Sequence, residues 1–186
     1  MTVANFAASS PARTTTRVRL RPTMSSDLEF VVSLESDPVN LPFITPWERT
    51  QHEAAIRFPD FRHFIIEGGP GLDAVGFVIL IGCRSQHQSL ELKRMVVNNK
   101  GAGYGRAALR VAKKVAFDDL GAHRLWLDLK ADNSRAQALY DSEGFVVEGR
   151  LREAVKVAAG FESLVVMSML QTEFSGRRGL GLEMHA

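Results

Sequence analysis

The sequence predicts a single mixed α/β domain in which helices flank a central sheet. A buried strand from Ser89 to Asn98, a glycine-rich turn and a helix over Gly105–Leu120 are followed by a strand over Arg124–Leu129. A strand–helix–strand order of this kind places its two strands in parallel through a right-handed crossover. Earlier in the chain, Phe61–Glu67 and Ala74–Leu80 flank four turn residues, which indicates an antiparallel hairpin. The length of 186 residues suits one hydrophobic core.

The remaining elements follow from periodicity and capping residues. Val18 and Leu20 alternate with arginines, as in a half-buried strand over Arg17–Arg21. A helix is expected to begin near Asp27 and to continue through Glu35, because Ser25 and Ser26 offer caps and acids follow in the first turn. The other expected segments are a loop over Asp37–Pro46, helices over Trp47–Phe58 and Ser134–Glu143, and strands over Phe145–Leu151 and Leu164–Leu170.

The two ends of the chain are expected to lie outside the domain. Residues 1–16 contain no acid and are rich in Ser, Thr and Ala, so they are interpreted as a disordered arm, with a transit peptide as the alternative. Residues 175–186 are rich in glycine and polar residues and are expected to form a flexible tail. The predicted domain therefore spans residues 17–174.

The composition excludes several classes of function. A net charge of +2 is too small to indicate nucleic-acid binding, and no apolar run approaches the roughly 18 residues of a membrane span. The single cysteine, Cys83, excludes an intrachain disulfide, and the five histidines have no metal-ligand spacing. We therefore expect a cytoplasmic protein that uses no metal and binds neither nucleic acid nor a membrane.

A glycine-rich turn at the start of a helix is the strongest functional signal. Glycines allow the backbone to approach a ligand, and the amides at a helix N-terminus favour an anion. The alternative is a tight turn without function. The spacing fits neither the dinucleotide fingerprint nor the phosphate loop of NTPases, and we interpret the turn as a diphosphate site. Its residues are Lys100, Gly101, Ala102, Gly103, Tyr104, Gly105 and Arg106.

A second motif follows about thirty residues later. The run from Asn133 to Phe145, NSRAQALYDSEGF, resembles the N-x-x-A-x-x-L-Y-x-x-x-G-F pattern of the GNAT superfamily of N-acetyltransferases. The glycine turn resembles the same family's [Q/R]-x-x-G-x-[G/A] pyrophosphate loop, with Lys100 in the Gln/Arg position and a loop about two residues shorter. The resemblance covers residues 17–173 and is nearest to the ribosomal-protein N-terminal and spermidine acetyltransferases.

The resemblance implies a fold and a cosubstrate. It predicts a sheet that is splayed between its two central parallel strands, with acetyl-CoA lying in the opening. The residues that it implies for cofactor binding are the glycine turn together with Met95, Val96, Val97, Asn133 and Ala136. Asn133 would bind the pantetheine arm, although it could serve only as a helix cap. Tyr140 would protonate the departing thiolate, although it could be only a core aromatic residue.

The general base has two candidates. A lysine-like amine is neutral in only about one molecule in a thousand near pH 7.4, whereas an α-amino group is about a quarter neutral. Glu91 is the first candidate, because in a gapped alignment it occupies a position where histone-type members carry a glutamate. Asp128 is the second, because it interrupts the apolar strand Leu125–Leu129 and matches an acid of ribosomal-protein N-terminal acetyltransferases. Each could instead be a surface acid or form a salt bridge.

The expected reaction is direct attack of a primary amine on acetyl-CoA. The resemblance favours a protein or peptide N-terminal amine, or a small amine, as the acceptor. The alternatives are a polyamine such as spermidine, because Glu148–Glu153 resembles both branches, or a non-catalytic acyl-CoA-binding regulatory module. Intact Tyr140 and two available acids favour an enzyme. A homodimer is compatible with the sequence, which does not fix the oligomeric state.

Overall fold

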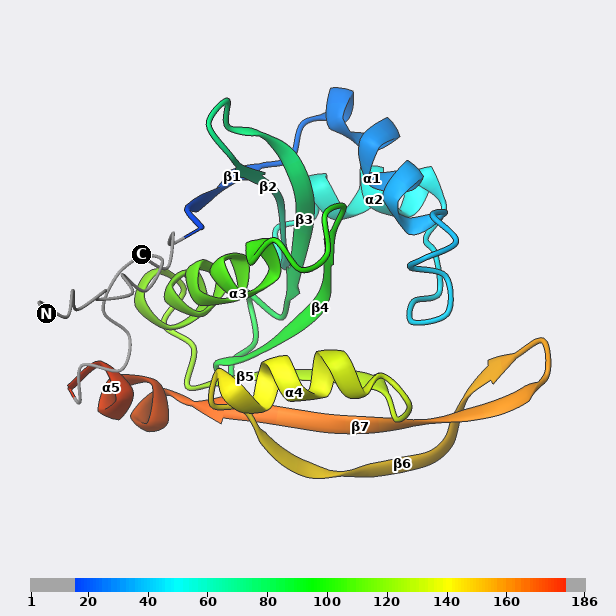
Figure 1. The fold of residues 1–186 in the computed structure, drawn as a ribbon. Helices are drawn as coiled ribbons and strands as arrows, with labels where there is room; N and C mark the ends of the chain where they lie inside the picture. The colour runs from blue at the N-terminus through cyan, green and yellow to red at the C-terminus, as the bar shows by residue number, and fades with distance from the viewer. Residues whose placement is uncertain (1–15, 180–186) are drawn as a thin grey trace, which may run out of the picture.

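Seven strands form one mixed sheet in the order β1-β2-β3-β4-β5-β7-β6 (Figure 1). The computed structural model describes residues 16–179, with only the backbone for residues 177–179. The predicted arm up to Thr15 and the tail beyond Gly179 lie outside this described part. No helix within it is long and apolar enough to cross a membrane.

The elements follow the predicted order along the chain. The strands are β1 (Val18–Pro22), β2 (Phe61–Gly68), β3 (Asp73–Ile81), β4 (Ser89–Val97), β5 (Arg124–Lys130), β6 (Val146–Val157) and β7 (Gly160–Leu170). The α-helices are α1 (Leu28–Glu35), α2 (Arg49–Arg57), α3 (Tyr104–Lys114), α4 (Ser134–Ser142) and α5 (Gln171–Gly179). A 3₁₀ turn, η1 (Ser25–Asp27), precedes α1, and a π-helical turn, η2 (Val115–Asp119), extends α3.

The splay between the two parallel strands is confirmed. β4 and β5 pair only from Ser89–Glu91 with Arg124–Trp126, and then diverge. Where β3 pairs with β4, Ile79 lies opposite Arg94 and the next residue, Leu80, lies opposite Leu92. Lys93 therefore has no partner in β3 and forms a bulge. A bulge bends the strand that carries it. The bend falls two residues after the last pair with β5, where the strands separate.

The sheet buries both faces against helices. Along β3, Val78 and Leu80 join a large core with α3, α4 and α5, whereas Phe77 and Ile79 join a smaller core with α1. Alternate residues of a strand point to opposite faces, so β3 reads as a continuous apolar run. Helix α1 thus covers one face of the sheet, and α3, which follows the glycine turn, covers the other.

The observed elements differ from the predicted ones in three places. The β6–β7 hairpin is longer than expected on both strands and extends beyond the rest of the sheet (Figure 1). Nearly all of β6 is exposed, so it lacks the alternating apolar pattern that marks a half-buried strand. Helix α2 begins after a Glu48 cap, two residues later than the predicted start at Trp47. Helix α5 continues beyond the predicted domain end at residue 174, and its Phe174 is buried in the main core.

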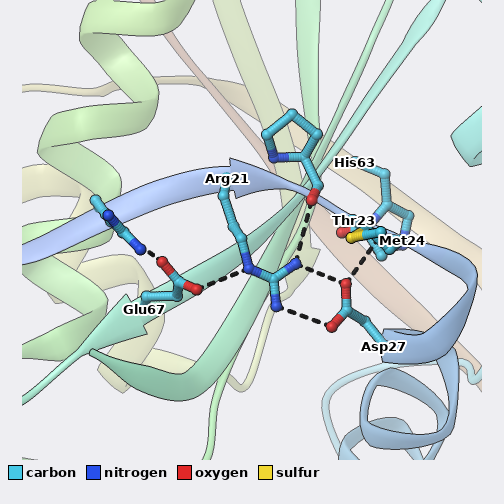
Figure 2. A network of polar contacts seen from close by, with 8 residues as sticks. Arg21, Thr23, Met24, Asp27, His63 and Glu67 are labelled. Atoms are coloured by element: carbon cyan, nitrogen blue, oxygen red, sulfur yellow. Dashed lines mark hydrogen bonds and ion pairs between the residues drawn. The ribbon is translucent and has the colours of Figure 1, made fainter. Parts of the chain in front are cut away.

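Two ion-pair networks join the elements around the core. Figure 2 shows Arg21 of β1 between Glu67 of β2 and Asp27 of η1, at 2.7 Å from each carboxylate. On α3, three basic residues of one face have a structural role: Arg106, Arg110 and Lys113 all contact the buried carboxylate of Glu143 at the end of α4. The second network therefore fixes the phosphate-loop helix to the helix of the second motif.

Candidate active site

A cavity of about 1040 Å³ occupies the splay between β4 and β5. It brings together the diverging strands, the glycine turn, helix α4 and the loop that joins α1 to α2. Its lining residues are Asn40, Phe43, Ile44, Thr45, Pro46, Trp47, Gln51, Leu92, Lys93, Arg94, Met95, Val96, Val97, Lys100, Gly101, Gly103, Gly105, Arg106, Asp128, Leu129, Lys130, Asn133, Arg135, Ala136, Ala138, Leu139, Tyr140, Ser142, Val155 and Leu164. Most of the predicted site residues thus share one cavity.

The glycine turn forms one end of this cavity. Gly103 precedes α3 with a φ of 85°, in the left-handed region that favours glycine, and no side chain caps the helix there. The first amides of α3 are therefore available to an anion, and the helix dipole favours a negative charge at this end. The cations Lys100, Arg106 and Arg135 line the same end. An uncapped amide cradle among three cations fits the diphosphate of coenzyme A.

Two of these cations also have partners within the protein. The Lys100 ammonium donates a hydrogen bond to the Val39 carbonyl at 3.0 Å, and burial with the nearby charge of Arg135 lowers its pKa. Arg106 pairs with Glu143 at 2.6 Å, although almost half of its side chain remains exposed. An ammonium has three donor hydrogens and a guanidinium five, so both residues can contact an anion as well.

The start of α4 places the second motif beside the glycine turn. The Asn133 side chain accepts a hydrogen bond from the Ala136 amide at 3.2 Å, so it caps the helix while it lines the cavity. One turn further on, Leu139 lies near Gly105: a Cβ added to that glycine would be 3.9 Å from the leucine side chain. The motif residues thus join the two halves of the predicted cofactor site.

Tyr140 lines the cavity from the last turn of α4. Its ring contacts Phe145 at 5.6 Å between centroids, in an edge arrangement. Burial raises the pKa of the Tyr140 hydroxyl to about 12, so it stays protonated at neutral pH. Among the described residues, none forms a hydrogen bond with this hydroxyl, which leaves it free to donate a proton to a substrate atom.

The two candidate bases occupy different environments. Asp128 lies on β5 and is the single carboxylate among the described residues that line the cavity. Within residues 16–179 its side chain forms no ion pair. Glu91 does not line the cavity; it lies in the paired part of β4, opposite Trp126, and its carboxylate contacts Lys93 at 3.0 Å. The geometry therefore supports Asp128 over the first sequence-based candidate.

Three further cations line the cavity from β4 and β5, and each has an acidic partner. Lys93 pairs with Glu91 at 3.0 Å, Lys130 with Glu162 at 2.7 Å, and Arg94 with Glu35. Their positive charges are thus largely compensated within the protein. Asp128 therefore keeps the only uncompensated charge on this side of the cavity, as far as the described residues show, and that charge is negative.

A buried polar cluster beside the loop that joins α1 to α2 was not predicted from the sequence. Glu35 on α1 contacts Arg94 on β4 and lies 3.6 Å from His52 on α2. Side-chain hydrogen bonds extend this cluster from His52 to His63, at 3.1 Å, and from His63 to the Thr23 hydroxyl, at 2.9 Å. Burial and the neighbouring His52 lower the pKa of His63 to about 4, so its ring is neutral at pH 7.

Sequence reasoning missed this cluster because its members are far apart and individually ordinary. Glu35 and Arg94 are 59 residues apart, and His52 and His63 do not have the spacing of metal ligands. Two other predicted residues, Ala102 and Tyr104, do not line the cavity: the Ala102 carbonyl accepts from Thr16, and the Tyr104 ring packs against Gly68. Among the described residues, no three potential ligands come together to hold a metal ion.

The fold and this cavity define an acyltransferase of the GNAT type. The model of the acetyltransferase (GNAT) domain matches residues 17–146, and the chain belongs to this family. It is an acetyl-CoA-dependent acetyltransferase. The spermidine N(1)-acetyltransferase of Vibrio cholerae is 28% identical over 117 residues, which cover 62% of this chain and 67% of the relative. That of Escherichia coli K12 is 24% identical over 168 residues, covering 84% and 88%.

Solved structures of spermidine N-acetyltransferases share the fold. A spermidine N-acetyltransferase chimera from Vibrio cholerae superposes with a TM-score of 0.78 at 25% identity, covering 87% of this chain and 99% of the other. The Vibrio cholerae enzyme in complex with CoA and spermine gives 0.77 at 24% identity, covering 86% and 98%. A further structure of that enzyme is a dodecamer. The homodimer of this chain stays a prediction.

A bulky residue at position 103 tests the phosphate cradle. We expect Gly103→Val to lower the affinity for acetyl-CoA by about tenfold or more, or some 1.4 kcal/mol. The left-handed φ resists a β-branched residue, and the new Cβ would lie 2.8 Å from the Thr16 hydroxyl. Calorimetry with acetyl-CoA measures the loss. Gly149→Val, whose Cβ would meet open space, is the control; unchanged affinity in a folded Gly103→Val protein would contradict the assignment.

Proposed function

We propose that this chain transfers the acetyl group of acetyl-CoA to a primary amine of a polyamine, as the similar spermidine acetyltransferases do by their names. The structural observation behind transfer to a cationic amine is the Asp128 carboxylate, which lines the cavity and has no ion-pair partner among the described residues; the relatives are what favour a polyamine among such amines. A carboxylate there attracts an ammonium group. Beside it, Met95, Leu129, Val155 and Leu164 offer apolar surface for an aliphatic chain.

In the proposed mechanism Asp128 and Tyr140 have opposite tasks. Asp128 binds the ammonium group and accepts its proton, directly or through water, so that the nitrogen lone pair becomes available. The new N–C bond forms as the C–S bond breaks. Tyr140 gives its hydroxyl proton to the departing sulfur, and a raised pKa keeps that proton in place until then. The nitrogen loses its second proton as the amide forms. That proton returns through water to the Tyr140 oxygen, and Asp128 releases the first proton to solvent. A backbone amide near Met95 would polarise the thioester carbonyl.

The cosubstrate would be held by residues that the sequence singled out, together with Arg135, which the structure adds. The amides after Gly103, with Lys100, Arg106 and Arg135, would bind the diphosphate. Asn133 and Ala136, together with the β4 residues Met95, Val96 and Val97, would line the pantetheine arm. Acetyl-CoA supplies the acetyl group as a thioester.

A peptide N-terminal amine is the second candidate acceptor, and the charge of the cavity favours it. A polyamine carries several positive charges, whereas the described lining offers one uncompensated carboxylate, enough for a single ammonium. An α-amino group also needs less help from a base, because its pKa is near 7.8. The relatives favour the polyamine, and the charge count favours the single amine.

A panel of amines separates the two acceptors. We expect spermidine and spermine to give kcat/KM at least about tenfold above that of short peptides with free N-termini, a difference of about 1.4 kcal/mol. Simple aliphatic monoamines serve as the control for chain length and charge, and release of free thiol is the readout. A clear preference for peptides would replace the polyamine with the N-terminal amine. No turnover with any amine would favour the non-catalytic module.

Removing the Tyr140 hydroxyl tests whether this residue acts as the general acid. We expect Tyr140→Phe to lower kcat about 10²–10⁴-fold, the usual contribution of general acid catalysis, while acetyl-CoA affinity stays unchanged. The ring and its contact with Phe145 remain, so stability should hold. Steady-state kinetics with the best amine and calorimetry with acetyl-CoA measure the two quantities. A kcat near that of the wild type rules out the acid role, and equal losses in both would assign a positioning role instead.

Replacing each candidate base by its amide, Asp128→Asn and Glu91→Gln, decides which carboxylate accepts the proton. We expect Asp128→Asn to lower kcat/KM for the amine by about 10²-fold, with partial recovery as the pH rises and more of the amine is neutral. Glu91→Gln should have little effect, because its carboxylate faces Lys93 and does not line the cavity. The reverse result would restore Glu91 as the base. Small effects of both would leave the amine to deprotonate in solution.

A further inference from the structure

The acceptor side of the cavity is bounded by a segment without helix or strand. It joins α1 to α2 and contributes an apolar wall to the cavity, with the residues Phe43, Ile44, Thr45, Pro46 and Trp47. A segment of this kind has few internal backbone hydrogen bonds to fix its shape. Its conformation must therefore come from contacts with its neighbours.

One arginine of β4 makes two contacts with this wall and a third with α1. The Arg94 guanidinium donates through Nη1 to Glu35 and through Nη2 to the Thr45 carbonyl at 2.9 Å. The same group lies over the Trp47 ring, 5.2 Å from its centroid. A planar guanidinium can satisfy a carboxylate, a carbonyl and an aromatic face at once, which an ammonium cannot do.

Glu35 completes the arrangement from α1. One of its carboxylate oxygens contacts Arg94, and the other accepts from the Trp47 amide at 2.5 Å. Although burial opposes ionisation, the neighbouring His52 and the charge of Arg94 hold the pKa of Glu35 below its usual value. Only 1% of the Glu35 side chain and 8% of the Arg94 side chain are exposed. With both oxygens engaged, Glu35 is not available as a base.

We propose that Glu35 and Arg94, together with the Thr45 carbonyl and Trp47, form a clamp that positions the acceptor wall. Glu35 and Arg94 are positioning residues: they act on the amine through residues 45–47. The proposal rests on transfer to an amine, whichever amine that is. Loss of the clamp should raise KM for the amine while the chemical step and the phosphate cradle, which involve other residues, stay largely intact.

An ion pair that serves only stability is the competing explanation. Arg94→Lys separates the two, because lysine keeps a positive charge for Glu35 but cannot also reach the Thr45 carbonyl and stack on Trp47 in the same geometry. The clamp predicts a selective rise in amine KM. A purely stabilising pair predicts a lower melting temperature with unchanged kinetic constants in the folded protein.

The kinetic test uses spermidine, or the amine with the highest kcat/KM in the panel if spermidine is a poor acceptor. For Arg94→Lys we expect amine KM to rise about tenfold or more, kcat to change by less than about threefold, and acetyl-CoA affinity to stay within about twofold. The control is Arg49→Lys in the exposed Arg49–Glu53 pair on α2, which should leave all three values unchanged. Choosing the amine in this way keeps the test valid if the polyamine proposal fails.

A second variant protects the test against misfolding. The double substitution Glu35→Gln and Arg94→Met leaves neither charge buried without its partner, which is the costly outcome of a single deletion. We expect its amine KM to match or exceed that of Arg94→Lys. A folded double variant with the wild-type amine KM would overturn the proposal, as would parallel losses in kcat, amine KM and cofactor affinity.

Tryptophan fluorescence gives a readout that does not depend on turnover. The chain has two tryptophans, so a Trp126→Phe background leaves Trp47 as the reporter. We expect Arg94→Lys in this background to raise acrylamide quenching of Trp47 about twofold or more, because the half-buried indole loses the guanidinium that covers it. Unchanged quenching with unchanged amine KM overturns the clamp.

Discussion

The short parallel pairing between β4 and β5 is the constraint on which the rest of the site depends. The strands share three residue pairs and then separate, immediately before the bulge at Lys93. Each strand retains its antiparallel partner on the other side, so the sheet tolerates the opening. The glycine turn follows β4 directly, and the second motif follows β5. The divergence of the two strands therefore sets the distance between the phosphate cradle and Tyr140.

Charge divides this cavity into two functional halves. At the glycine turn, cations and uncapped amides face the site and suit an anion. On the opposite side, Lys93, Arg94 and Lys130 are each compensated by an acid, and within the described part of the chain Asp128 is the one carboxylate that lines the cavity. The ion pairs thus allow one cavity to suit both a polyanionic cosubstrate and a cationic acceptor.

The parts of the site that the sequence predicted are those encoded by local patterns. Gly103 and Asn133 each begin a helix, and short-range rules for turns and caps apply to both. The splay followed from the family resemblance. The order of the two candidate bases did not follow from local patterns, because only the packing of the strands shows that Asp128 lines the cavity while Glu91 lies outside it against Lys93. Glu35 and Arg94 are brought together only by the packing of α1 on the sheet, which no local pattern reports.

Burial favours the neutral form of two groups in and behind the cavity and is overcome at a third. It keeps Tyr140 protonated, as an acid must be, and it keeps His63 neutral. Glu35 is the buried exception that stays ionised, because Arg94 lies against it. A charge of that kind is retained at a cost in desolvation, which is offset only while its partners stay in place. The contacts that keep the Glu35 charge compensated therefore also hold residues 45–47, which form one wall of the cavity.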